Sequence, residues 1–411
     1  SDEDYIGVER EPYLAYDRTY GACIIGGEVY QGTVFPELNG KYLFADFISN
    51  RIMALSSTSE QVEPEIETLL TGLSGQSVDI PQGAGITGIF PMPDGEILIT
   101  IIGNRMESIP GKIYRLKRAA DVPDPPAKLS ELGVFADLTI LTPVAGIIPY
   151  ETQSPLWSDR AVKRRWMAVP NDGSYDNEDE EITFRHKQDW DFPVGTVFIK
   201  QFDLPMSEGE NPEMRRLETR FFVIGEDNKS YGLTYKWNEE GTEAFLQGGG
   251  SEQTFTITDE DGQFAFQQTW DFPGRANCMT CHNSTAKHVL GVKTHQLNGE
   301  MYYPHLGGER NQLEYLNEIG IFQRDIGSAE QYARAYPIDD ESIDLDLRIK
   351  SYFDANCSSC HRPGALPTVN MDLQFHTPLV LKNIIGIQTT SNASDPDRLI
   401  IQAGDHYVSE F

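Results

Sequence analysis

The chain has 411 residues, of which 39% are hydrophobic and 10% aromatic, so it can form packed cores and is not disordered throughout. Its formal net charge of −30 argues against a nucleic-acid ligand and against an anionic membrane surface, because both require clustered lysine and arginine. The sequence contains no run of about 18 apolar residues, so no membrane span is predicted. At about 100–200 residues per domain, this length predicts a multidomain protein.

The region 1–118 is predicted to consist of β-strands. Apolar runs separated by Gly, Asn and Pro cover residues 41–47 and 51–55, and two more cover residues 96–102 and 111–116. Strands at this spacing are typical of about one propeller blade with an additional edge. Because one blade cannot bury both of its faces, we expect this propeller-blade-like region to pack on the rest of the chain, on another subunit or on a missing partner.

A proline-rich linker at 119–128 separates this region from a second β-rich domain, 129–273. Aromatic and β-branched residues dominate the runs 196–200, 220–224 and 232–237, as they do in the strands of a β-sandwich or jelly roll. The N-terminal two thirds of the chain are therefore predicted to be β-rich.

The sequence pattern changes at about Gly274. Apolar residues recur at helical spacing over 311–322 and 342–353, and the second of these segments leads directly into a pair of cysteines. We therefore predict a mainly α-helical, cytochrome c-like C-terminal region made of two modules, 274–340 and 341–411.

The motif Cys-x-x-Cys-His occurs twice in a chain that has five cysteines. Two thiols at this spacing can add to the two vinyl groups of one haem, and the adjacent histidine then ligates the iron. The motifs therefore predict two covalently bound haem c groups, with His282 and His361 as iron ligands. The residues predicted to hold the haems are Cys278, Cys281 and His282 in the first motif, and Cys357, Cys360 and His361 in the second.

Three other uses of paired cysteines explain this pattern less well. A zinc site built from the four paired thiols would leave the histidine after each pair without a role. A thioredoxin-like redox pair needs one Cys-x-x-Cys on a βα unit rather than two in helix and loop. A disulfide within each pair would close a strained, very short loop. The remaining cysteine, Cys23, is expected to be a small buried hydrophobic residue.

Beyond these motifs, the sequence resembles a family of bacterial dihaem c-type cytochromes, most of whose members are conserved hypothetical proteins. The resemblance covers much of the second and third regions, and it implies two covalent haems. It rests on residues 150–159, 163–166, 190–196, 216–220, 278–282, 296–298 and 311–313.

The segments 25–32 and 35–42 resemble the last blade of glucose/sorbosone-dehydrogenase-like propellers, which often precede this dihaem module. The resemblance therefore extends to the N-terminal region. Here the propeller is cut to about one blade. Its sugar-oxidising site and its quinone cofactor are therefore not assumed to be present.

Each iron also needs a sixth ligand or keeps an open site. Of the eight histidines, five follow the first motif and belong to neither motif. For the first haem we predict His295, or otherwise His305, and for the second we predict His406 in preference to His376 and Met371. Either distal histidine could instead come from a neighbouring chain. Two histidine ligands would close the iron and favour electron transfer over peroxide or oxygen binding.

The leading hypothesis is an electron-transfer dihaem cytochrome without substrate chemistry of its own. The alternatives are the haem domain of a quinoprotein-type dehydrogenase, a dihaem peroxidase, or a subunit of a polymeric extracellular cytochrome filament. The filament is suggested by the single blade, because its unpaired edge strands could form hydrogen bonds with a strand of another chain.

The expected partners are redox proteins or extracellular acceptors, together with a possible homo-oligomer or filament. Ser1 is not an initiator methionine, and no signal sequence follows it. We therefore expect either a removed signal peptide or a processed or partial start, and a periplasmic or extracellular location.

Overall fold

The structure, a computed structural model, divides into two compact units, Ser1–Pro123 and Asp124–Phe411. The boundary falls within the segment 119–128 that the sequence marks as a linker. None of the described helices is long and apolar enough to cross a membrane. The structure describes residues 14–16, 21–48, 50–55, 66–70, 85–102, 111–116, 125–225, 230–274, 277–365, 370–387 and 399–401.

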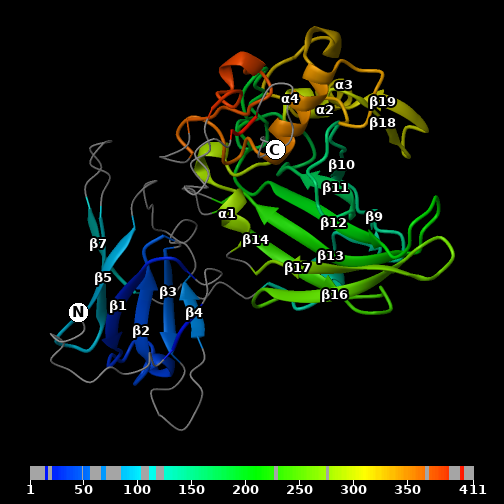
Figure 1. Cartoon of the computed structure of the whole chain (residues 1–411). Coiled ribbons are helices and arrows are strands. Elements are labelled where there is room, and N and C mark those ends of the chain that lie inside the picture. The colour runs from blue at the N-terminus through cyan, green and yellow to red at the C-terminus, as the bar shows by residue number, and fades with distance from the viewer. Residues whose placement is uncertain are drawn as a thin grey trace. The chain divides into compact units, whose positions relative to one another are not determined.

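The first unit contains two antiparallel sheets (Figure 1). Four strands follow one another in order in the first sheet, as in a propeller blade, and three form the second. The β-rich structure expected for this region is therefore present. The strands are β1 (Ile24–Val29), β2 (Tyr42–Asp46), β3 (Arg51–Leu55), β4 (Ile66–Leu70), β5 (Ile86–Pro91), β6 (Ile97–Ile101) and β7 (Lys112–Arg115).

Apolar residues of both sheets form one core in this unit. Leu43 and Ile52 from the first sheet and Ile89 from the second are buried in it. Gly95, in the turn between β5 and β6, has φ +81°, and a Cβ atom there would lie 2.4 Å from the carbonyl oxygen of Gln31. Glycine is therefore required where this hairpin meets the chain that follows β1.

Cys23, directly before β1, is exposed, so the expectation that it is buried is wrong. The backbone N–H groups of Ala22 and Cys23 both donate to the carboxylate of Asp46, at 2.7 and 2.5 Å. Asp46 is the buried residue of this contact. The backbone of Cys23 is therefore fixed at the sheet while its thiol faces solvent.

The second unit is built on a six-stranded antiparallel sheet in the order β10-β11-β12-β13-β14-β15 (Figure 1). A long hairpin, β16–β17, and the short pairs β8–β9 and β18–β19 accompany it. The strands are β8 (Phe135–Asp137), β9 (Thr142–Pro143), β10 (Ile148–Pro149), β11 (Val162–Ala168), β12 (Val197–Pro205), β13 (Met214–Val223), β14 (Tyr231–Trp237), β15 (Ala244–Leu246), β16 (Ser251–Thr258), β17 (Phe264–Phe272), β18 (Glu300–Tyr303) and β19 (Gly308–Asn311).

Both faces of the six-stranded sheet are covered, because side chains alternate between its two sides. On one face, neighbouring strands contribute Trp166, Ile199 and Phe221 to a core with the chain that follows the linker. The opposite face carries Met167, Phe198 and Phe222, which pack against residues of the C-terminal part. This second face is called the motif face below, because it carries the first cysteine motif.

The C-terminal part is not mainly α-helical, so the predicted mainly α, cytochrome c-like C-terminal region is wrong. Much of its described chain is loop, 3-10 turn and the β18–β19 hairpin. In these loops, side chains donate hydrogen bonds to backbone carbonyls that lie outside the α-helices. The side-chain amide of Asn298, for example, donates to the carbonyls of Ala329 and Tyr332. The α-helices in it are α1 (Cys278–Cys281), α2 (Thr294–Leu297), α3 (Gln312–Glu318) and α4 (Leu345–Asn356).

The predicted helix over 311–322 shows why the periodicity misleads. Only α3 forms, because Gly320 adopts φ +77° and turns the chain. Phe322 then pairs with Ile182 in an isolated β-bridge and is buried in the core. The apolar residues at the end of this segment are thus buried in the core although the chain there is extended and not helical.

The predicted helix over 342–353 corresponds to α4. Asp344 caps its N-terminus by accepting a hydrogen bond from the backbone N–H of Asp346. The helix ends at Asn356, directly before the second motif. It therefore fixes where the second pair of thiols begins.

Candidate functional site

Each of the two Cys-x-x-Cys-His motifs forms a tight turn of its own. In the first motif, α1 spans the two cysteines, and the backbone N–H of His282 donates to the carbonyl of Cys278 at 3.0 Å. In the second, the N–H of His361 donates to the carbonyl of Cys357 at 2.8 Å. The same hydrogen bond therefore gathers both thiols and the imidazole of each motif around one turn.

The two motifs lie side by side, although they are distant in the sequence. The side-chain amide of Asn283 donates to the carbonyl of Ser359 at 3.0 Å, and the guanidinium of Arg362 donates to the carbonyl of Thr285 at 3.1 Å. Burial raises the pKa of the Cys281 thiol, and the neighbouring Cys360 raises it further. The two motifs are therefore joined by hydrogen bonds between the residues in and shortly after them.

The thiols of both motifs are free. Among the described residues, no three His, Cys, Asp or Glu side chains come together as a metal-binding group.

His282 is oriented as an iron ligand requires. Its Nδ1 lies 2.6 Å from the carbonyl oxygen of His288, and because a carbonyl only accepts, Nδ1 carries the proton and the lone pair is on Nε2. The ring stacks on Phe222 of the motif face, with centroids 4.1 Å apart. Burial lowers the pKa of His282 to about 4, so the ring is neutral at neutral pH. A neutral imidazole is the form that binds a metal.

The sheet leaves room for the first motif at Gly232 on β14. A Cβ atom at this position would lie 2.4 Å from Sγ of Cys278. Gly232 is directly opposite Phe222 on β13, so the residue that admits the thiol and the residue that stacks on the imidazole are neighbours. The donor set and its seat on the sheet therefore fit a covalently held haem at the first motif.

The second motif fits a haem through its donors and its surroundings. Nδ1 of His361 is buried and has no hydrogen-bond partner among the described residues. The carbonyl of His361 accepts from the N–H of Leu373 at 2.9 Å, which fixes the backbone of the motif. This histidine is therefore positioned by its backbone, whereas His282 is also held through its ring.

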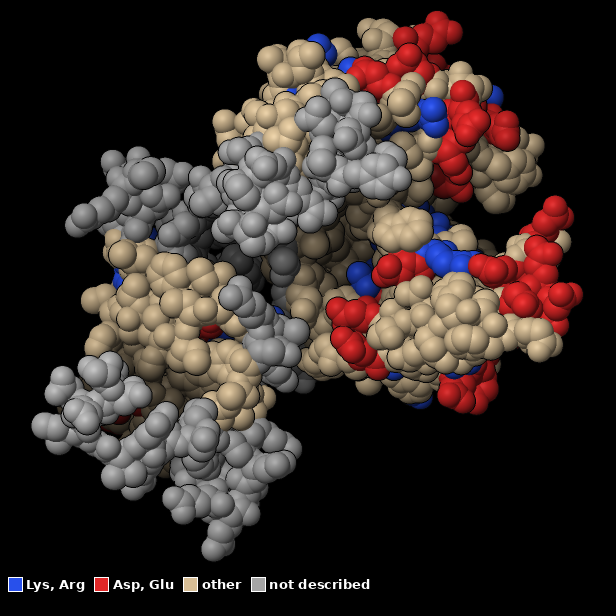
Figure 2. Space-filling model, in the orientation of Figure 1, with Lys and Arg blue, Asp and Glu red and all other residues tan. Residues whose placement is uncertain are grey.

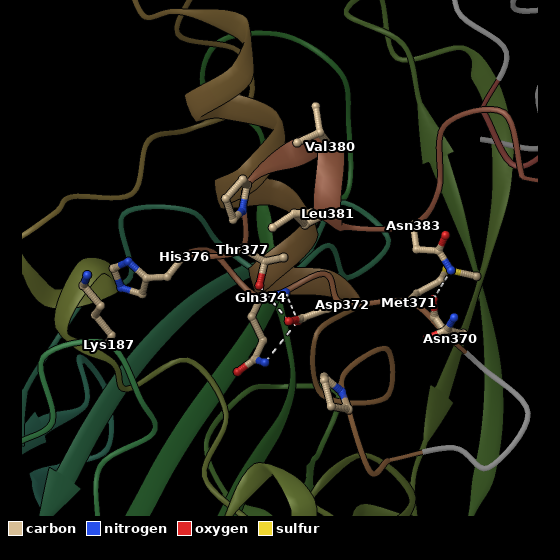
Figure 3. Close-up of a pocket in the computed structure, with 12 residues that line it drawn as sticks. Lys187, Asn370, Met371, Asp372, Gln374, His376, Thr377, Val380, Leu381 and Asn383 are labelled. Carbon is tan, nitrogen blue, oxygen red and sulfur yellow. Dashed lines mark hydrogen bonds between the residues drawn. The ribbon is translucent and has the colours of Figure 1, made fainter.

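A cavity of about 790 Å³ opens next to the second motif (Figure 3). Pro363, two residues after the motif histidine, lies in its wall. Val380 and Leu381 also line it, and they are 83% and 66% exposed. The complete lining is Lys187, Pro363, Asn370, Met371, Asp372, Gln374, His376, Thr377, Pro378, Val380, Leu381 and Asn383.

Two of the candidate distal ligands line this cavity. In Figure 3, His376 lies beside Lys187 on one side, and Met371 lies near Asn383 on the other. Nε2 of His376 is buried and has no hydrogen-bond partner among the described residues. Burial, reinforced by His295 and Lys187, lowers the pKa of His376 to about 4. This imidazole is therefore neutral at neutral pH, and its Nε2 is available to bind a metal.

The other candidate distal ligands are engaged or lie outside the described residues. Nε2 of His295 is 2.8 Å from a carboxylate oxygen of Asp354, and its ring stacks on Phe375. Nε2 of His305 is 3.0 Å from the hydroxyl of Tyr315. His406 lies outside the described residues. The ligand assignments of these histidines stay predictions.

A buried ionic network, which sequence reasoning missed, supports the second motif. Asp354 on α4 accepts hydrogen bonds from Nζ of Lys293, at 3.2 Å to each oxygen, and from His295. Burial opposes ionisation of Asp354, but Lys293 and His295 hold its pKa well below its usual range. Asp189 extends the network to Lys293, at 3.5 Å, and to Arg362. Nothing in the order of acidic and basic residues along the chain predicts this pairing.

No protein-family model matches the chain, and no solved structure gives a significant match.

Proposed function

We propose that the chain is a c-type cytochrome that holds two haems side by side and carries electrons between redox partners outside the cytoplasm. The observation that supports this most directly is the pairing of the two Cys-x-x-Cys-His turns through Asn283 and Arg362. Haems attached at adjacent turns would be close enough to exchange electrons.

Each motif would hold its haem through two thioethers and one imidazole. At the first motif, Cys278 and Cys281 would form the thioethers, while the carbonyl of His288 and the ring of Phe222 orient His282. When bound, haem supplies an iron that takes up and releases one electron. The protein contributes the orientation of the ligand and the exclusion of water from it.

The second motif has its own support for a closed iron. His376, whose Nε2 has no hydrogen-bond partner among the described residues, and Met371, which has a thioether sulfur, both line the cavity beside it. A haem there would also cover Val380 and Leu381, which are otherwise exposed. An iron with two protein ligands has no open position for peroxide, which favours electron transfer over the peroxidase alternative.

The charge of the chain indicates the kind of redox partner. Figure 2 shows Asp and Glu side chains gathered in several clusters on the described surface. With a net charge of −30, the protein repels anionic acceptors and attracts cationic ones at long range. We therefore expect a partner with a basic docking surface, and faster reduction of that partner at low ionic strength than at high.

The test is the haem content of the protein produced in a host that attaches haem c. The intact mass should exceed that of the polypeptide by two haems, and denaturing electrophoresis should retain the haem stain. Cys278→Ser should lower the content by one haem. Cys23→Ser, which removes an exposed free thiol far from either motif in the sequence, should leave it at two. A mass equal to the polypeptide alone contradicts the proposal.

A further inference from the structure

Three cations stand in a row across the motif face. Arg165 on β11 is directly opposite Lys200 on β12, and Lys200 is directly opposite Arg220 on β13. Thr234 on β14 continues the row. Directly opposed side chains in an antiparallel sheet approach within about 5.5 Å at Cβ, and like charges at such positions are destabilising. In a chain with a net charge of −30, this concentration of positive charge calls for an explanation.

The described residues do not neutralise this cation row, defined as Arg165, Lys200 and Arg220. Glu218 pairs with Arg220, but the same carboxylate oxygen also accepts from the indole of Trp270 at 2.8 Å. Arg165 and Lys200 have no ion pair within the described part of the chain. The row therefore has two basic side chains without an acidic partner among the described residues, in a partly buried place.

Polar groups in the row and next to it also lack hydrogen-bond partners. Nε of Arg220 and Oγ1 of Thr234 are both buried and unpartnered among the described residues. Thr234 is 1% exposed. Burial, together with Arg165 and Arg220, holds the pKa of Lys200 well below its usual range. Buried donors without acceptors are costly, and a bound anion would satisfy them.

The row lies next to the first motif. Arg220 and Phe222 are two residues apart on β13, about 7 Å along the strand, and therefore share one face. Phe222 stacks on the ring of His282.

We infer that the cation row binds the two propionate carboxylates of the haem held by the first motif. This inference rests on the proposed function. A haem carries two carboxylates on one edge, and the row has two basic side chains without an acidic partner among the described residues. A carboxylate beside Lys200 would favour the charged form of this lysine. Arginine suits this task because its guanidinium presents several donors to a carboxylate in a fixed geometry.

The test uses the holoprotein and the reduction potentials of its two haems. Lys200→Gln removes one cation, and Lys200→Arg keeps the charge. Lys236→Gln is the matched control, because Lys236 lies on the same face of β14 but outside the row, with Nζ 4.1 Å from the ring centroid of Phe272. A cation next to the haem edge favours the reduced iron, so its loss lowers the potential.

We expect Lys200→Gln to lower one of the two potentials and to leave the other in place. Lys200→Arg should restore it, and Lys236→Gln should change neither. Two attached haems with potentials that do not respond to Lys200→Gln overturn the inference. A protein without covalent haem overturns the proposed function instead, so the two failures are distinguishable.

Amine acylation of Lys200, followed by mass spectrometry, gives a second readout should Lys200→Gln fail to fold. In the holoprotein Lys200 should be protected. In the Cys278→Ser/Cys281→Ser variant, which lacks the first haem, it should be acylated faster, while acylation of Lys236 is unchanged. Equal acylation of Lys200 in both proteins overturns the inference.

Discussion

His282 and His288 hold each other through their backbones: each ring donates from Nδ1 to the carbonyl oxygen of the other residue, at 2.6 and 2.8 Å. His288 adopts φ +63°, in the left-handed region, which folds the chain back and makes this exchange possible. The orientation of the His282 ring thus depends on a backbone carbonyl and on the local turn.

This exchange predicts different effects for the two histidines. His282→Ala should abolish the low-spin absorption spectrum of one haem, because it removes the proximal nitrogen. His288→Asn should keep both low-spin spectra, because asparagine tolerates the left-handed region and the carbonyl remains. Absorption spectra of the two variants provide the comparison. Loss of a low-spin haem in His288→Asn would contradict this expectation and show that the imidazole of His288, and not its backbone alone, is needed at the site.

In the first unit, the buried carboxylate of Glu96 predicts a loss of stability in acid. Burial alone would raise its pKa, but hydrogen bonds from the Tyr30 hydroxyl, at 2.7 Å, and from the N–H groups of Val34 and Thr33 lower it below its usual value. A depressed folded-state pKa stabilises the fold above the unfolded-state pKa, and this contribution disappears as the pH falls through the folded-state pKa. Urea unfolding of this unit should therefore shift to lower midpoints below about pH 4.5.

The substitution Glu96→Gln should lower the free energy of unfolding by about 1–3 kcal/mol at neutral pH, because charge-assisted bonds are replaced by weaker ones. It should also remove much of the acid dependence. Asp94→Asn is the matched control in the same hairpin, since its ion pair with Arg115 is exposed and contributes at most about 1 kcal/mol. Equal unfolding free energies for the two variants contradict this role of Glu96.

The sequence predicts the β-strands well because they are carried by local signals. Runs of β-branched and aromatic residues bounded by Gly, Asn and Pro correspond to strands such as β3, β12 and β14. Helical periodicity in the last third was less informative. Ile321 and Phe322 continue the helical spacing of α3, but they are buried from an extended segment after Gly320. Burial by long-range contacts overrode the local pattern there.

The candidate site shows the same division. Cys-x-x-Cys-His is a local motif, so its candidate haem-binding residues can be recognised from five consecutive residues of sequence. The proximity of Asn283 to Ser359 and the row of Arg165, Lys200 and Arg220 depend on strand register and on packing between distant segments. Strand alternation could place each cation on one of two faces, but the register that aligns them is not encoded locally.

The buried network around Asp354 predicts a large effect on the second motif. Asp354→Asn leaves Lys293 and the hydrogen-bonded His295 without their carboxylate, and breaking a buried pair in this way costs about 3–5 kcal/mol. The region around the second motif should unfold first on heating, with loss of the axial ligation of its haem, which stays covalently attached. Asp346→Asn on the same helix is the control, because its pair with Lys350 is exposed and contributes about 0.5 kcal/mol. Thermal unfolding followed by haem absorbance separates the two variants, and equal melting temperatures would contradict the role of the network.

The cavity beside the second motif predicts which side chain completes its iron. His376 offers a neutral ring with an unpartnered Nε2, whereas Met371 packs partly into the core around Phe353 and Leu373. We therefore expect His376→Ala to convert one haem from low-spin to high-spin and to let it bind CO rapidly. Met371→Leu, which conserves volume, should leave the spectrum unchanged. His406→Ala provides the rival arm: if it, and not His376→Ala, opens the iron, the ligand is His406. A sulfur-to-iron charge-transfer band in the oxidised protein, lost in Met371→Leu, would instead identify methionine.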